Sequence, residues 1–293
     1  MSTIDIALAR CEFPPTGTSV DLAISGGADS VGLALLASYA GLNAHLHYVD
    51  HHLRAGSGRD GELVRALADF LGFTVSVHEV DVAPGGNLEA RARAARRAVL
   101  PERTMTGHTM DDLAETVILN MLRGAGLDGL SPMVGDPTKP ILALRRAEVL
   151  ELVRAAERPY VIDETNADVT WLRNRVRHET LPTLNRTASR DLVPLLARQA
   201  NLIYEERQWL DRLSEQDAAR PLQELDCREL RQWPLARLRR WLRVRLRGHD
   251  DEAHPPSADE IERVIAVVRG EIVATEITGG RRVARHEQHL RLE

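Results

Sequence analysis

The sequence predicts an α/β fold in which a Rossmann-like parallel sheet is followed by a helical extension and a small C-terminal α+β domain. Strand-like and helix-like segments alternate through the first half of the chain, and this repeat implies right-handed crossovers and a parallel sheet covered on both faces. Beyond about Trp171 long helical stretches replace the alternation, and the last residues are again β-like. The 293 residues, 43% of them hydrophobic, are enough for two domains, which we place at residues 1–185 and 186–293.

Each element of the first half follows from its own pattern. Short apolar runs predict four strands, at residues 20–25, 44–50, 74–80 and 103–107. Apolar residues at helical spacing predict the four helices that follow these strands, at residues 29–40, 58–71, 88–100 and 111–123. Ligands of such sheets bind at the carboxyl ends of the strands, so we expect the chemistry in the segments SGGADS, DHHLR and GHTMDD.

The second half is predicted to be mainly helical. Helices are expected over residues 191–220 and 225–247, and a polar, proline-containing connector then leads to a helix with Ser257 as its N-cap. The tail contains the β-like segment EIVATEI, a Gly-Gly turn and the segment RRVARHEQHLRLE.

Charge narrows the possible functions. The net charge of −5 argues against a generally basic nucleic-acid binder, but residues 227–247 carry eight arginines and one glutamate. Leucine and tryptophan recur there at roughly helical spacing, so one side of a helix can pack while the other presents guanidinium groups. A phosphate-binding stripe and a solvated helix face both stay open, because Lys139 is the only lysine and arginine is the default cation of this chain.

Neither a membrane protein nor a cysteine-based site is indicated. No apolar run reaches the ~18 residues of a membrane span, and the first residues lack a basic segment followed by an apolar one. We therefore expect a cytoplasmic protein without membrane contact. Cys11 and Cys227 lie far apart in the sequence and form no CxxC pair, which predicts two inert thiols.

A glycine-rich turn follows the first predicted strand. The strand ends at Ser25 and runs through Gly26 and Gly27 into a helix that starts near Asp29. This places unobstructed backbone N–H groups beside a helix N-terminus, where partial positive charge favours phosphate. A Walker A loop would need a lysine and a Rossmann fingerprint would need GxGxxG, and this turn has neither.

The segment SGGADS is similar to the SGGxDS PP-loop of the ATP pyrophosphatases, which break the bond between the α- and β-phosphates of ATP. A plain strand-to-helix turn is the alternative for so short a motif. The resemblance implies a sheet of the adenine nucleotide alpha hydrolase type, with ATP bound by the loop and by the acidic residue that ends the second strand. These expected ATP-binding residues are Ser25, Gly26, Gly27, Ala28, Asp29, Ser30 and Asp50.

Further motifs, in the same order along the chain, resemble one family of that superfamily, the tRNA(Ile)-lysidine synthetases. They are VDHxLR at residues 49–54, a helix with Glu89, Ala92, Arg93 and Arg96, GHxxDDxxET at 107–116, a segment with Asp163 and Asn166, and RNxxRxxxLP at 173–182. Two positions depart from the family pattern: Arg97 stands where tyrosine is usual, and Thr165 replaces a serine.

The resemblance implies a ligase with ATP and Mg²⁺ as cofactors. Its partners would be free L-lysine and tRNA(Ile) bearing the CAU anticodon. In that family the ring carbonyl oxygen of the wobble cytidine is adenylated, pyrophosphate leaves, and the side-chain amine of lysine displaces AMP. The modified base then reads AUA instead of AUG. The resemblance also suggests a homodimer.

The same resemblance assigns roles to individual residues. The expected catalytic residues are Asp29, Arg93, His108, Asp112 and Glu115. Asp29 is also the expected Mg²⁺ ligand, and Asp112 and Glu115, three apart on one helix face, are the expected lysine ligands. Contacts to tRNA are expected from Arg173, Arg177, Arg237 and Arg240. A plainer explanation of Asp111 and Asp112 is favourable charge at a helix N-terminus.

Three other functions stay open. A PP-loop tRNA-cytidine thiolase would need cysteine pairs that this sequence lacks. An ammonia-using amidating ligase would have no need of an arginine-rich helical region. A non-catalytic adenine-nucleotide sensor on the same sheet would release no pyrophosphate when substrates are added.

Overall fold

The structure, a computed structural model, describes residues 2–50, 57–80, 88–162, 168–218, 226–246 and 256–293. It forms two compact units, Met1–Tyr204 and Glu205–Glu293, each with its own hydrophobic core. The division falls inside the long helix α10 (Val193–Ala218), because the first part of α10 packs against α5 (Met110–Leu122). The boundary expected after residue 185 therefore lies within the first unit.

A four-stranded parallel sheet organises the first unit. Its strands, in the order β3-β2-β1-β4, are β1 (Ser19–Ala23), β2 (Asn43–Asp50), β3 (Thr74–Glu79) and β4 (Met105–Thr106). All neighbouring pairs are parallel, so the predicted α/β class is confirmed. β4 is shorter than predicted, and Arg103 just before it has a φ of +66° that a strand does not accommodate.

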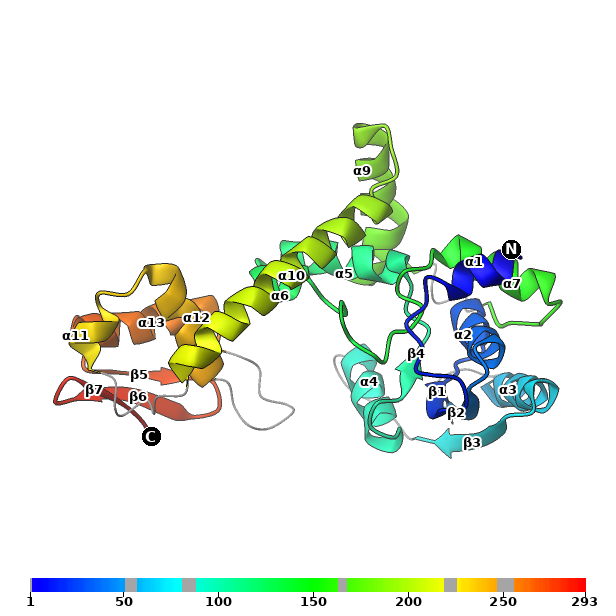
Figure 1. Cartoon of the computed structure of the whole chain (residues 1–293), viewed down its shortest axis with the longest axis horizontal. Helices are drawn as coiled ribbons and strands as arrows, with labels where there is room; N and C mark the ends of the chain where they lie inside the picture. Colours follow the sequence, from blue (N-terminus) through cyan, green and yellow to red (C-terminus); the bar gives the residue numbers. More distant parts are fainter. Residues whose placement is uncertain (1, 51–56, 81–87, 163–167, 219–225, 247–255) are drawn as a thin grey trace. The chain divides into compact units, whose positions relative to one another are not determined.

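Helices follow the strands as predicted. They are α2 (Ala28–Tyr39), α3 (Ser57–Leu71), α4 (Leu88–Val99) and α5. Figure 1 shows α2 and α3 on one side of the sheet and α4 on the other. A short helix that the sequence analysis did not predict, α1 (Thr3–Leu8), precedes β1 and begins with a capping box between Ser2 and Asp5.

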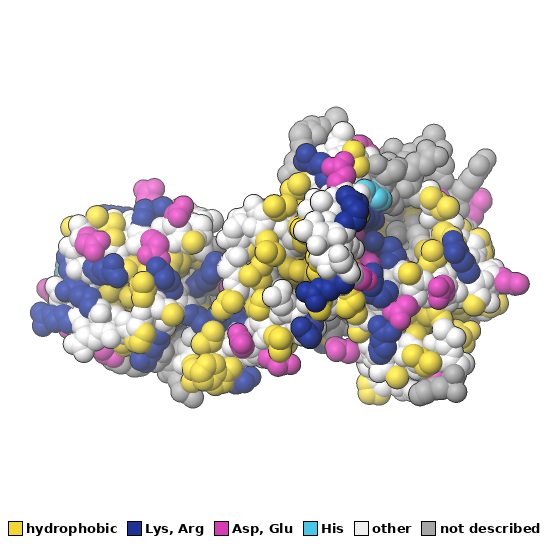
Figure 2. All heavy atoms as spheres, turned by 90° about the horizontal axis from the view of Figure 1, so that it is seen from above, with side chains coloured by type: hydrophobic (Ala, Val, Ile, Leu, Met, Phe, Trp, Pro, Cys, Tyr) yellow, Lys and Arg dark blue, Asp and Glu magenta, His cyan; other side chains and the backbone are white. Residues whose placement is uncertain are grey.

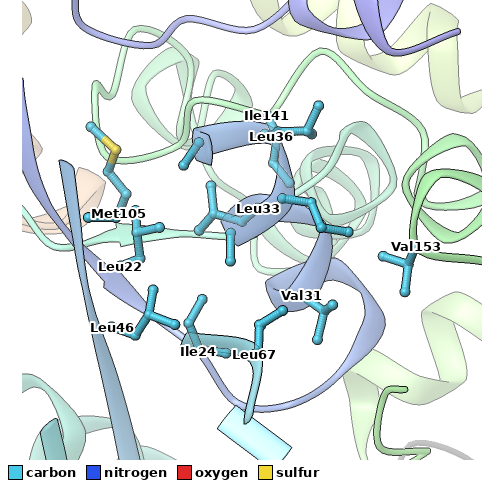
Figure 3. Packing of buried hydrophobic residues seen from close by; sticks show 14 of the residues in the cluster. Leu22, Ile24, Val31, Leu33, Leu36, Leu46, Leu67, Met105, Ile141 and Val153 are labelled. Carbon is cyan, nitrogen blue, oxygen red and sulfur yellow. The ribbon is translucent and has the colours of Figure 1, made fainter. Parts of the chain in front are cut away.

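The core of the first unit lies between the sheet and the helices α2, α3 and α7 (Arg146–Ala155). Figure 3 shows how their apolar side chains meet, among them Leu22, Leu33, Leu46, Leu67 and Val153. Helix α2 is apolar on almost its whole surface, because it packs on the sheet on one side and on α7 on the other.

Glycine at position 32 lets α2 and α7 approach closely. A Cβ atom at Gly32 would lie 2.2 Å from Cγ1 of Val149, well inside van der Waals contact. Both positions are near the first turns of their helices. This packing therefore holds the start of α7, and with it Arg146, beside the start of α2.

The first unit contains further helices, and beyond about Trp171 it is mainly helical, as predicted. The additional helices are α6 (Leu127–Leu130), α8 (Leu172–Arg175), α9 (Leu181–Ala188) and the beginning of α10. Between α8 and α9 the chain forms a π-helical turn, η2 (Val176–Thr180). Such turns are rare and frequently occur at functional sites.

The second unit combines helices with a small antiparallel sheet. Its helices, besides the end of α10, are α11 (Cys227–Leu230), α12 (Leu235–Arg245) and α13 (Ala258–Arg269). Its strands, in the order β5-β6-β7, are β5 (Ala274–Ile277), β6 (Arg281–His286) and β7 (His289–Leu292). The predicted small α+β region and the N-cap at Ser257, which forms a capping box with Glu260, are confirmed.

One sequence prediction for this unit is wrong in detail. The single helix expected over residues 225–247 is broken at Pro234, which is the N-cap of α12, because proline has no N–H to continue a helix. The segment RRVARHEQHLRLE forms the two strands β6 and β7. Glu287 and Gln288 both have positive φ, +46° and +67°, and so form the tight turn between β6 and β7.

Within the described residues, no helix is long and apolar enough to cross a membrane.

Candidate active site

The predicted PP-loop connects β1 to α2 as a tight turn. Gly26 has a φ of +84°, and a Cβ atom there would lie 3.1 Å from Cγ2 of Val161. Its carbonyl oxygen accepts a 2.9 Å hydrogen bond from the N–H of Val161, which bridges the loop to the segment after α7. Gly27 is the N-cap of α2 and has no side chain to cap the first N–H groups. This helix terminus therefore suits an anion.

The serines of the loop fix its shape. Ser30 Oγ donates a 2.8 Å hydrogen bond to the carbonyl of Gly27 and accepts a 3.2 Å bond from the N–H of Ser25. Ser30 is buried and Ser25 is exposed. The loop therefore holds its conformation through its own side chains.

The segment after β4 lies directly against the start of α2. A Cβ atom at Gly107 would lie 2.6 Å from the carbonyl oxygen of Asp29, so only glycine allows this approach. Nδ1 of His108, the next residue, lies 2.6 Å from Oγ1 of Thr106. Two segments that the sequence marked separately, SGGADS and GHTMDD, are thereby in contact.

The acidic pair of α5 is almost fully buried. Asp112 is 8% exposed and Glu115 1% exposed. Asp112 belongs to the capping box of α5, in which its Oδ2 accepts hydrogen bonds from the N–H (2.9 Å) and Oγ1 (2.8 Å) of Thr109. The plainer explanation of Asp111 and Asp112 as a helix-terminus feature thus holds in part for Asp112.

Three arginines converge on these carboxylates from segments outside α5. Arg146 begins α7, Arg173 lies in α8, and Arg177 lies in η2. We call the six side chains the carboxylate–arginine cluster: Asp29, Asp112, Glu115, Arg146, Arg173 and Arg177.

Arg146 joins the two parts of the cluster. Its Nε donates to Asp29 (3.1 Å), its Nη1 to Glu115 (3.1 Å) and its Nη2 to Asp112 (2.9 Å). Arg173 donates to Glu115 and Asp112, each at 3.1 Å. Arg177 donates from Nε (2.7 Å) and Nη2 (3.0 Å) to Glu115 and lies 3.6 Å from Asp112.

The pKa values of Asp29 and Asp112, two carboxyl groups of the cluster, are shifted in opposite directions. Burial raises the pKa of Asp29 to about 6, although Arg146 acts against this shift. Burial alone would also raise the pKa of Asp112, but Arg146, the Thr109 N–H and Arg173 outweigh it and lower that pKa to about 2. Burial would lower the pKa of Arg146, yet the surrounding carboxylates raise it. Asp112 and Arg146 are therefore charged at neutral pH.

Asp111 has a different role from its neighbour. Its carboxylate accepts two 3.1 Å hydrogen bonds from Arg145 and a 2.8 Å bond from the N–H of Arg146. It thereby ties the start of α7 to α5 and helps to place the Arg146 side chain.

Asp29 fits the predicted role of a magnesium ligand. Its Oδ1 is buried and has no hydrogen-bond partner among the residues that the structure describes, while Oδ2 faces Arg146. Mg²⁺ prefers oxygen ligands and in nucleotide sites uses one or two carboxylates together with phosphates. The described residues contain no group of three His, Cys, Asp or Glu side chains that could hold a metal by themselves, so phosphate oxygens would have to complete the set.

The other predicted residues of the first unit are placed as follows. Asp50 is buried at the carboxyl end of β2, the edge of the sheet from which the PP-loop leaves. Arg93 lies in α4, but its side chain is outside the described residues, as are residues 51–54, 163 and 166. Arg173 and Arg177, expected to contact tRNA, instead point at the acidic pair in this structure.

The two arginines predicted in the second unit are engaged with their own unit. The guanidinium of Arg237 lies 3.9 Å from the ring centroid of Trp233. Arg240 donates a 3.1 Å bond to the carbonyl of Arg207 and pairs with Asp211. On the face seen in Figure 2, basic side chains of this unit are interspersed with acidic and apolar ones.

Arg146 is a site residue that the sequence analysis missed. The only local signal is a pair of arginines, Arg145 and Arg146, between an apolar run and a helix. Nothing in that segment indicates that its second arginine reaches residues 31 to 117 positions earlier.

The two cysteines carry no site. Both are free thiols, and Cys227 is buried. Burial raises the pKa of Cys11 to about 12 and also raises that of Cys227. Their reactivity is correspondingly low.

The parallel sheet, the SGGADS loop and its neighbouring carboxylates define a protein of the PP-loop class, and residues 3–184 match the PP-loop domain family. Among curated proteins, the tRNA(Ile)-lysidine synthase of Gloeobacter violaceus is 35% identical over 83% of this chain and 83% of its own length. The tRNA(Ile)-lysidine synthase of Thermobifida fusca is 34% identical over 94% of this chain and 92% of its own. The chain belongs to the tRNA(Ile)-lysidine synthase family.

The fold is also found among solved structures. The U34-tRNA thiolase NcsA from Methanococcus maripaludis, solved with its [4Fe-4S] cluster, superimposes with a TM-score of 0.57 at 17% identity. The match covers 69% of this chain and 78% of the thiolase chain. At this identity the likeness concerns the architecture alone.

Proposed function

We propose that the protein uses ATP to ligate L-lysine onto the wobble cytidine of tRNA(Ile) with a CAU anticodon, releasing AMP and pyrophosphate. The observation that carries this proposal is the contact between the nucleotide loop and the acidic helix. Arg146 bonds Asp29 on one side and Asp112 and Glu115 on the other. Membership of the lysidine synthase family supports the same reaction.

The nucleotide half of the site is the PP-loop and the start of α2. Backbone N–H groups of Gly27 and the first helical turn bind the triphosphate, and the helix dipole favours its charge. Asp29 holds Mg²⁺, which neutralises phosphate charge when bound. The carbonyl oxygen of cytidine is a poor leaving group. Breaking the α–β bond of ATP attaches AMP to this oxygen, so that AMP can leave when the lysine amine attacks.

The second half of the site receives lysine. The side-chain amine of lysine has an ordinary pKa near ~10.4 and must lose a proton before it attacks the activated base. Asp112 attracts the cation because it stays ionised at neutral pH, its own pKa being about 2. A carboxylate with so low a pKa is too weak a base to take the proton from the lysine ammonium group. Another group or solvent must therefore accept that proton. His108 follows β4 at the carboxyl edge of the sheet, and we propose that it contacts phosphate or the activated base.

The tRNA is the remaining substrate. The anticodon base must leave its stack to enter the site, as bases of RNA loops generally do when proteins read them. Arginines of the second unit, including Arg237, contact the phosphate backbone. A cytoplasmic location suits these substrates, and the active form is a homodimer, as the family resemblance suggests.

Incorporation of radiolabelled lysine tests the function. Protein, ATP, Mg²⁺ and labelled lysine are incubated with transcribed tRNA(Ile) bearing CAU or with tRNA(Met), which has the same anticodon. Asp112→Asn is the test variant, because the asparagine oxygen can still accept the hydrogen bonds from Thr109 but the side chain carries no charge. Glu151→Gln is the control, since Glu151 is an exposed acid of α7.

We expect label in tRNA(Ile) and none in tRNA(Met). The label should be lost with Asp112→Asn and retained with Glu151→Gln. Pyrophosphate release without label would keep the PP-loop chemistry and contradict lysine as the second substrate. No label and no pyrophosphate would leave the nucleotide sensor as the better description.

A further inference from the structure

Arginine side chains use the full hydrogen-bond acceptor capacity of the Glu115 carboxylate. The carboxylate is 1% exposed, and both oxygens accept two hydrogen bonds each. Oε1 accepts from Arg146 (3.1 Å) and Arg177 (2.7 Å), and Oε2 accepts from Arg173 (3.1 Å) and Arg177 (3.0 Å). A carboxylate has about four lone-pair sites. An ammonium group could reach Glu115 only by displacing a guanidinium.

The arginines have more donors than the carboxylates use. A guanidinium has five N–H donors. Bonds to the acidic residues use one N–H on Nε and one on Nη2 of both Arg173 and Arg177. The side chains are 27% and 23% exposed, whereas Glu115 below them is buried. Among the described residues, the Nη1 groups of Arg173 and Arg177 are not bonded to an acid of the cluster.

The arginines also lie beside the anion-binding end of α2. Arg146 is hydrogen-bonded to Asp29, in the first turn of that helix. Arg146 and Arg177 meet at the same oxygen of Glu115. Planar guanidinium groups bind carboxylate and phosphate through paired hydrogen bonds.

We infer that Glu115 is a positioning residue that holds Arg146, Arg173 and Arg177 as an oxyanion-binding triad, and that it does not contact the ammonium of the amino acid. The ligand of the triad is the carboxylate of free lysine or a phosphate of ATP. This inference rests on the proposed function and changes the role of one residue in it. The acidic contact to lysine then falls to Asp112 alone.

Calorimetric titration without tRNA tests the inference, because binding is measured and no turnover is needed. The three ligands are L-lysine, cadaverine (lysine without its carboxylate) and ATP with Mg²⁺. The test variant is Glu115→Gln, which keeps the shape of the side chain and loses its charge. Glu151→Gln is the matched control on α7, where the acid is exposed.

Glu115→Gln is expected to weaken the binding of lysine or of ATP at least tenfold and to leave the weaker binding of cadaverine unchanged. A loss confined to lysine identifies the carboxylate as the ligand, and a loss confined to ATP identifies phosphate. Equal losses for lysine and cadaverine with ATP unchanged would mean that Glu115 contacts ammonium, which overturns the inference. Unchanged affinity for every ligand would overturn it as well.

A second variant covers the case in which Glu115→Gln does not fold. Arg173→Gln removes one member of the triad from a partly exposed position, and the same selective loss is expected. If the wild type binds ATP but no lysine, the proposed function fails, and the ATP titrations of both variants still decide whether the triad binds an oxyanion.

Discussion

Gly107 sets the distance between two chemically important segments although it has no side chain. Its Cα faces the backbone of Asp29 and Ser30, where a Cβ atom would meet the carbonyl oxygen of Asp29 at 2.6 Å. Backbone atoms cannot turn aside as a flexible side chain does. The position therefore requires glycine for space, since its φ is not in the left-handed region.

Gly107→Ala is expected to lower the free energy of unfolding by about 1–3 kcal/mol, the usual range for overpacking. Pyrophosphate release should fall as well, because the loop and His108 move apart. Urea unfolding and a pyrophosphate assay measure the two effects. The control is Gly61→Ala in α3, where the nearest atom, in the ring of Tyr48, is 3.3 Å away and alanine favours the helix. Equal destabilisation by the two changes would contradict the steric argument.

Asp112 gives the protein a specific sensitivity to acid. The folded state lowers its pKa from 3.8 to about 2, so the unfolded state binds the proton first as the pH falls. The stability that comes from its ion pairs is full above the unfolded value and is lost as the pH falls through about 2. Thermal unfolding between about pH 5 and 2 should show a shallower loss of stability for Asp112→Asn than for the wild type. Parallel curves would contradict the assignment.

At the scale of elements, the site depends on how α7 and η2 meet α5. Arg173 and Arg177 are four residues apart across the junction of α8 and η2, so they share one side of the helical segment and both reach Glu115. Arg146 comes from a separate helix, at the start of α7. The packing of α2 against α7 decides where this third arginine lies.

Gly32→Ala should disturb this packing and Val149→Ala should restore part of it. The new Cβ would lie 2.2 Å from Cγ1 of Val149, so we expect about 1–3 kcal/mol of destabilisation and weaker ATP binding. In the double variant the methyl group that clashes is gone. A double-mutant cycle on the free energy of unfolding measures the coupling. Strictly additive effects would contradict the proposed contact.

Local patterns predicted the strand–loop–helix units well, because their signals are contained in a few neighbouring residues. SGGADS and GHTMDD were both placed at the carboxyl edge of the sheet before any tertiary contact was considered. The break at Pro234 was missed because the apolar spacing continues on both sides of it, although the proline itself was a sufficient signal.

Tertiary contacts were beyond local patterns. Glu115 and its arginine partners are separated by 31 to 62 residues, and no spacing rule connects them. The sequence thus predicted that the acidic pair binds a cationic ligand, whereas in the fold three arginine side chains already bind it. Arg146 could not be singled out, because its role depends on the approach of α7 to α2.

At the scale of the whole molecule, the arginines of the second unit differ in what they can offer to tRNA. Arg240 is 15% exposed and pairs with Asp211 and the carbonyl of Arg207, so part of its charge stabilises its own unit. Arg237 is exposed and stacks on Trp233. The arginine-rich segment of residues 227–247 is therefore not a purely solvated helix face. Its arginines are also not equivalent as possible phosphate contacts.

Arg237→Gln is expected to reduce the slope of log Kd against log salt concentration for tRNA by about 1, as for the loss of one phosphate contact. Arg240→Gln should mainly lower the thermal midpoint. Filter binding at several salt concentrations and differential scanning calorimetry separate the two effects. An unchanged salt slope for Arg237→Gln would exclude it as a backbone contact.

Arg146 also makes the two halves of the site depend on each other thermodynamically. A ligand that draws Asp29 away from this guanidinium alters the free energy with which a second ligand binds beside Asp112. Such coupling is reciprocal, so the factor by which ATP changes the affinity for lysine equals the factor by which lysine changes the affinity for ATP. In Arg146→Gln that factor should approach one, and the two small substrates would then bind independently.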